Sequence, residues 1–240
     1  MCKGCLVCKM KTAILKDGFR RLTVKQKVMI AAPVALIASM YLAFQGFSLM
    51  LGASRGYVAG FILYWIFWCI GLPVILLGVS GVASLYSQRS PKLGNKPWRT
   101  VLIISWPIVL PFATIFLPKI LTTGLSAIAV SVVLGVVIGI TEEIFWRGMF
   151  AKLFPNNFWA GSIYPSITFG LWHLAPLSVQ GANDPGGAFS FVFVSVLLGL
   201  SWSYYAQKTG SIRWCTAAHV INDSLGLAGI KWVPMLLTFV

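Results

Sequence analysis

Few side chains in this chain can carry acid/base chemistry. The sequence holds five acidic residues and two histidines, namely Asp17, Glu142, Glu143, Asp184, Asp223, His173 and His219. All of them except Asp17 and Asp184 fall within or beside strongly apolar stretches. An ionisable group in hydrocarbon costs about 2.5–3.5 kcal/mol even on a lenient scale, so such groups usually face an internal cavity and serve a function. Carboxylates and imidazoles that share a cavity are suited to moving protons to and from water.

The stretch TEEIFWRGMF, residues 141–150, contains both glutamates of the chain. On a helix, Glu143 and Arg147 are four residues apart and can form an ion pair, whereas Glu142 points about 100° away around the axis. This spacing predicts that Arg147 neutralises Glu143 and that Glu142 is left free for chemistry.

The two histidines have neighbours at helical spacing. In FGLWH, Phe169 and His173 share a helix face, so the aromatic ring can support the imidazole. In HVIND, His219 shares a face with Asn222 and Asp223, which can determine its tautomer.

Long apolar segments must hold these side chains in place. The chain is 58% hydrophobic and only 10% charged, which indicates a membrane protein rather than a soluble domain. Uniformly apolar segments of about 18 residues or more cross a bilayer as helices. We therefore predict an all-α polytopic membrane bundle of about eight transmembrane helices, at residues 28–53, 57–85, 100–117, 120–145, 160–176, 187–207, 212–227 and 229–240.

The net charge of +14 is better explained by membrane topology than by a nucleic-acid partner. With a cytoplasmic N-terminus, every Lys and Arg falls on the cytoplasmic side except Arg55, Lys119 and Lys231. This distribution predicts an integral, multi-pass protein with both termini in the cytoplasm and an even number of spans. The expected partners of the basic arm at residues 1–27 are anionic membrane lipids, and we expect no nucleic acid.

The depth of the acid/base residues restricts this arrangement. Glu142 and His219 fall near the cytoplasmic ends of their predicted spans, whereas a straight helix from residue 160 places His173 about 20 Å deeper. A shared site requires that the helix of Glu142 carries it deeper, or that the helix of His173 begins later, near Pro165. We predict a cavity that opens toward the cytoplasm, with Glu142 below the level of the headgroups.

Three motifs in order resemble those of the CAAX prenyl protease and bacteriocin-processing family of intramembrane glutamate proteases, also called the Abi family. They are Glu142-Glu143-x-x-x-Arg147, Phe169-x-x-x-His173 and His219-x-x-x-Asp223. The resemblance covers roughly residues 119 to 227. With it, the chain divides into a basic cytoplasmic arm at 1–27, N-terminal transmembrane helices at 28–118 and catalytic core helices at 119–240.

The resemblance implies an endopeptidase that hydrolyses a peptide bond in a prenylated or hydrophobic peptide without a cofactor. By carry-over, Glu142 is the general base that activates water, and His173 holds and polarises that water. His219 and Asp223 form the oxyanion side of the site, while Glu143 and Arg147 support its geometry.

The resemblance implies either Asn or Asp at the fourth residue after the second histidine, and this chain has Asp223 there, with Asn222 just before it. An ionised Asp cannot donate a hydrogen bond to an oxyanion. Either Asp223 is protonated and can donate, or Asp223 is an acceptor that orients His219 and His219 alone donates, or Asn222 takes the donor role. We favour the orienting role.

Other hypotheses use the same residues. Carboxylates and two histidines could bind a catalytic zinc ion, although the chain lacks the HExxH signature. The protein could instead be a non-proteolytic membrane scaffold or a bacteriocin immunity protein of the same family, but neither needs a base and an oxyanion donor. A transporter or proton relay would normally show repeated halves or broken helices, and a purely structural role would treat each group as an isolated helix-end residue.

The cysteines and tryptophans are expected to have structural roles. Cys2, Cys5 and Cys8 are interpreted as reduced thiols in the arm, and Cys69 and Cys215 as packing residues. Tryptophans near the ends of the predicted spans are interpreted as interfacial anchors, namely Trp98, Trp146, Trp159, Trp202, Trp214 and Trp232.

Removal of divalent metal ions should leave peptide hydrolysis unchanged, because the glutamate mechanism needs no Lewis acid. The measurement is cleavage by the purified protein before and after exhaustive chelation, with the metal content of the same sample determined. Loss of cleavage on chelation, restored by added zinc, would support the zinc hypothesis instead.

Overall fold

The computed structural model describes residues 22–87, 96–181 and 186–228. Most of the arm at 1–27, including Cys2, Cys5 and Cys8, lies outside the described residues. So do Asp17, Asp184, Trp232 and the predicted last span at 229–240. The predictions made for them remain predictions.

The first part of the chain forms three long helical stretches. The first is α2 (Val24–Leu51), and the second runs through α3 (Ala53–Leu63), η1 (Tyr64–Gly71), α4 (Leu72–Ala83) and η2 (Ser84–Tyr86). The third consists of α5 (Pro97–Pro111), η3 (Phe112–Phe116) and α6 (Leu117–Lys119). Gly52 alone separates α2 from α3, and its φ of 82° is available to glycine without strain.

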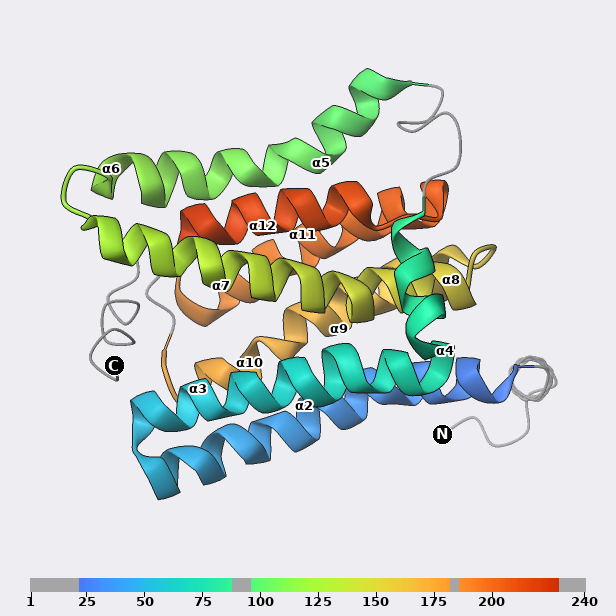
Figure 1. The fold of residues 1–240 in the computed structure, drawn as a ribbon, viewed down its shortest axis with the longest axis horizontal. Coiled ribbons are helices and arrows are strands. Elements are labelled where there is room, and N and C mark those ends of the chain that lie inside the picture. The colour runs from blue at the N-terminus through green and yellow to red at the C-terminus, as the bar shows by residue number, and fades with distance from the viewer. Residues whose placement is uncertain (1–21, 88–95, 182–185, 229–240) are drawn as a thin grey trace, which may run out of the picture.

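The remaining elements form four more stretches. They are α7 (Leu125–Glu143) with η4 (Ile144–Met149) and α8 (Phe150–Leu153), then η5 (Trp159–Ile163) with α9 (Tyr164–Trp172) and the short α10 (Leu174–Leu177), then α11 (Gly187–Thr209) and α12 (Arg213–Leu227). In Figure 1, α2 and α3 lie along one edge of the bundle, α5 lies along the other, and α7, α9, α11 and α12 run between them.

The fold class is confirmed, because the structure has only helical elements over the part of the chain that it describes. Among the residues that the structure describes, five helical stretches are long and apolar enough to cross a membrane, and they begin at Val24, Ala53, Pro97, Leu125 and Gly187. The shorter η5–α9 and α12 occupy the predicted spans at 160–176 and 212–227. The eighth predicted span, at 229–240, lies outside the residues that the structure describes.

The helix of Glu142 extends farther than predicted. The span expected at 120–145 runs from Leu125 to Leu153 through a π-helical segment, η4. Glu142 therefore lies about 12 Å farther from the end of its helix than predicted, at 1.5 Å per residue. The helix of His173 begins near residue 159, as predicted. The deeper position of Glu142 resolves the depth conflict between these two residues.

Small side chains let α12 approach the backbone of α7. Gly135 and Gly139 are buried on the face of α7 that meets α12. A Cβ atom added at Gly139 would lie 2.7 Å from the backbone nitrogen of Val220, and one added at Gly135 would lie 2.9 Å from the Val220 carbonyl oxygen. Such contacts between backbones are typical of small-residue packing between membrane helices. They bring His219, the neighbour of Val220, toward the C-terminal end of α7.

The replacement Gly139→Val should lower the free energy of unfolding by about 1–3 kcal/mol, because the added side chain would collide with α12. The measurement is thermal or denaturant unfolding in detergent micelles. Ala129→Val on the exposed face of the same helix is the matched control and should change little. Equal unfolding midpoints for the two variants would contradict this packing.

Candidate active site

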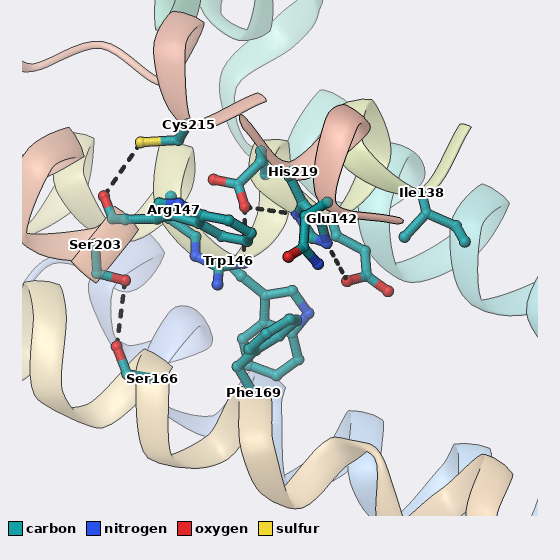
Figure 2. Close-up of polar contacts among 12 residues, drawn as sticks. Ile138, Glu142, Trp146, Arg147, Ser166, Phe169, Ser203, Cys215 and His219 are labelled. Atoms are coloured by element: carbon teal, nitrogen blue, oxygen red, sulfur yellow. Dashed lines mark hydrogen bonds and ion pairs between the residues drawn. The ribbon is translucent and has the colours of Figure 1, made fainter. Parts of the chain in front are cut away.

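A polar cluster lies where α7 passes into η4. The exposed fractions of Glu142, Glu143, Arg147 and His219 are 3%, 0%, 1% and 3%. Figure 2 shows Glu142, Arg147 and His219 gathered in one region, above Phe169. Charged side chains buried to this extent require partners, and within the cluster each of these four side chains lies within ion-pair distance of another.

Glu143 is the central residue of this cluster. Its Oε1 atom lies 2.9 Å from Nη1 of Arg147, which is the ion pair that the spacing of four residues predicts. The same Oε1 atom accepts a hydrogen bond from Nδ1 of His219 at 2.9 Å. Glu143 therefore connects two motifs that are far apart in the sequence, a role that local helix spacing did not predict.

The second nitrogen of His219 faces two further carboxylates. Nε2 lies 3.4 Å from Oδ2 of Asp223 and 3.9 Å from Oε2 of Glu142. Asn222 donates a hydrogen bond from Nδ2 to Oδ1 of Asp223 at 3.0 Å. Since Glu143 holds Nδ1, a proton on Nε2 would point toward Glu142 and Asp223.

Arg147 lies between two aromatic rings. Its guanidinium carbon is 4.1 Å from the ring centroid of Phe169 and 5.3 Å from that of Trp202. The ring of Trp202 also lies 4.7 Å from the imidazole of His219. Cation–π contacts are strongest when they are desolvated, so these rings support Arg147 where water does not reach it.

His173 has a defined tautomer in this structure. Its Nδ1 atom lies 2.8 Å from the carbonyl oxygen of Phe169. Because a carbonyl oxygen only accepts, Nδ1 must carry the proton, and Nε2 of the neutral ring is then an acceptor. The ring of Phe169 contacts the imidazole edge-on, with centroids 4.9 Å apart, as the spacing of four residues predicts.

Phe169 also connects the two histidines. Its ring centroid is 6.3 Å from that of His219, so the two imidazoles are separated by no more than the sum of these two ring distances. His173 also interacts electrostatically with Asp223 and His219. The structure therefore brings all eight predicted site residues into one region, namely Glu142, Glu143, Arg147, Phe169, His173, His219, Asn222 and Asp223.

Two of the tryptophans predicted to be interfacial anchors lie inside the protein instead. Trp146 and Trp202 are fully buried beside the site and are not interfacial anchors. By contrast, Trp98 and Trp159 are largely exposed, as anchors should be. Helix ends inferred from hydropathy do not show which side of a helix faces the protein interior, so no signal in the sequence separated these residues.

The arrangement is suited to proton transfer at a water molecule. Glu142 is a buried carboxylate that lies beyond hydrogen-bond distance of His219, while Glu143 is occupied by Arg147 and His219. His173 offers an acceptor nitrogen, Nε2, because its Nδ1 atom donates to the carbonyl oxygen of Phe169. No group of three His, Cys, Asp or Glu side chains within the described ranges is placed to hold a metal ion.

The fold and the cluster together define a helical membrane protein with a buried carboxylate–histidine cluster. Residues 124–225 match the family model described as "Type II CAAX prenyl endopeptidase Rce1-like". For this part of the chain, the match confirms the family resemblance that the three motifs predict. Comparisons with curated proteins and with solved structures gave no match.

The replacement Arg147→Met should destabilise the protein by about 3–5 kcal/mol, because it leaves the carboxylate of Glu143 buried without its cation. Adding Glu143→Gln should restore much of this loss, since Gln can still accept the hydrogen bond from His219. The measurement is a double-mutant cycle of unfolding in micelles. Arg213→Met at an exposed position is the matched control. Additive effects of the two site replacements would contradict the pairing.

Proposed function

We propose that this protein is an intramembrane endopeptidase of the CAAX type, which uses Glu142 to activate a water molecule. Its substrate is a prenylated or otherwise hydrophobic peptide. The observation that carries the proposal is the pairing of adjacent glutamates with different partners inside an Rce1-like domain. Glu143 is bound by Arg147 and His219, whereas Glu142 lies 3.9 Å from His219 and remains able to accept a proton.

In the proposed reaction, Glu142 takes a proton from a water molecule as the oxygen of that water attacks the carbonyl carbon of the scissile peptide bond. The tetrahedral intermediate then collapses, and Glu142 returns that proton to the nitrogen of the leaving amine as the carbon–nitrogen bond breaks. His173 orients the water, because its Nε2 atom can accept a hydrogen bond while Nδ1 is held by Phe169. Burial favours the role of Glu142 as the base, since a carboxylate partly removed from water is a stronger base.

The oxyanion side is assigned to His219. Nδ1 of this residue donates to Glu143, so His219 is assigned as an imidazolium, the form in which Nε2 also carries a proton that it can donate to the developing negative charge. Asp223 is an acceptor that receives a hydrogen bond from Asn222 and faces Nε2 of His219. This supports the orienting role for Asp223. Asn222 is less suited to the donor role because its amide already donates to Asp223.

The proposed orientation places both termini in the cytoplasm, with the basic arm against anionic lipids. Helix α2 begins at the end of the bundle where α12 begins, and α12 finishes at the opposite end (Figure 1). A cytoplasmic C-terminus then requires one more crossing after residue 228, which agrees with the predicted span at 229–240.

The replacement Glu142→Gln should reduce peptide cleavage by about 100-fold or more, because it removes the base and keeps the side-chain volume. The measurement is product formation from a farnesylated CAAX peptide, detected by mass spectrometry with the protein in micelles or vesicles. Thr141→Val is the matched control and should keep its activity, since the Thr141 hydroxyl bonds only within its own helix. The same peptide without its prenyl group tests the substrate class.

Several results would contradict the proposed peptidase function. A scaffold or immunity protein would keep its cellular phenotype in the Glu142→Gln strain at normal protein levels. Cleavage that persists unchanged in this variant would remove Glu142 from the mechanism. Cleavage that depends on added zinc would favour the zinc-dependent variant of the peptidase.

A further inference from the structure

Aromatic side chains from the N-terminal half of the chain enclose a residue next to His173. Trp172 is fully buried, and its ring stacks on that of Tyr64 with centroids 3.8 Å apart and an interplanar angle of 19°. The rings of Phe44 and Phe61 lie 6.1 Å and 6.0 Å from Trp172. All three of these partners lie outside residues 124–225, which the family model matches.

Tyr64 also contacts the helix that carries Glu142. Trp146, one helical turn after Glu142, donates a hydrogen bond from Nε1 to the hydroxyl oxygen of Tyr64 at 2.7 Å. Both side chains are fully buried, so neither polar group can bond to water in the folded protein. The hydrogen bond between them takes the place of the bonds to water that each group makes in the unfolded chain. Tyr64 therefore touches one side chain beside each of two proposed catalytic residues, Trp146 beside Glu142 and Trp172 beside His173.

The backbone is π-helical both at Tyr64 and at η4, the segment that follows Glu143. Tyr64 begins the π-helical segment η1, which packs against both α7 and the π-helical segment η4. Single π-helical turns within α-helices occur frequently at functional sites.

We propose that Tyr64 is a positioning residue that sets the separation between Glu142 and His173 through Trp146 and Trp172. This inference rests on the peptidase function proposed above. It makes the N-terminal half of the chain a part of the catalytic unit. Reaction rates depend steeply on such separations, because a misplacement of about 1 Å can reduce the rate about 100-fold.

The kinetic test uses Tyr64→Phe, Trp146→Phe and the double variant on a farnesylated CAAX peptide. Tyr64→Phe keeps the stacked ring but removes the acceptor of the Trp146 hydrogen bond, so kcat should fall about tenfold while KM changes less than twofold. The double variant should be no worse than either single variant, because both remove the same bond. Tyr41→Phe at an exposed position of α2 is the matched control. Additive losses, or a change confined to KM, would overturn the proposal.

A second test does not depend on peptidase activity. Diethyl pyrocarbonate reacts with an unprotonated imidazole nitrogen, and His173 and His219 are the only histidines of the chain. The rate of modification at His173, measured by peptide mass spectrometry, should change severalfold in Tyr64→Leu, stay near the wild-type rate in Tyr64→Phe, which keeps the stack, and be unaffected in Tyr41→Leu. An unchanged rate in Tyr64→Leu would overturn the proposal. If the wild-type protein cleaves no peptide but this rate responds as expected, the peptidase function fails and the positioning role stands.

Discussion

The geometry of the site depends on Glu143, whose buried carboxylate forms an ion pair with Arg147 and accepts a hydrogen bond from His219. One of its oxygens lies 2.9 Å from Arg147 and 2.9 Å from His219, and the exposed fraction of its side chain is 0%. A buried carboxylate without such partners would be strongly destabilising. The folded state must therefore keep the helix of Glu143 against the helix of His219. Once Nδ1 of His219 is bound in this way, Nε2 is directed toward Glu142 and Asp223.

Two features of the helix packing hold the helices of Glu143 and His219 together. Small side chains on α7 allow α12 to come close, and large aromatic side chains surround Arg147. Gly135 and Gly139 allow the backbone of α12 to lie against α7. Farther along, the guanidinium of Arg147 is enclosed by Phe169 and Trp202. The charged cluster thus sits within an aromatic layer, where electrostatic interactions are stronger than in water.

Exposure differs across the site in a way that matters for a peptide substrate. Glu142 and His219 are buried, but the side chain of Asp223 is 20% exposed and His173 is half-buried. Exposure is therefore greater at His173 and Asp223 than at Glu142, Glu143 and Arg147.

The sequence by itself determined the class of fold, the order of most helices, and eight candidate residues that the structure brings close together. Apolar segment length and helical spacing report these directly, as the ion pair of Glu143 with Arg147 and the contact of Phe169 with His173 illustrate. Other features were decided only by the tertiary structure. These are the bond from Glu143 to His219, the burial of Trp146 and Trp202, the link through Tyr64, and the depth of Glu142. Each of them depends on which helix faces meet and on a π-helical change of register at η4, and periodicity along a single segment carries no information about the face of a distant helix.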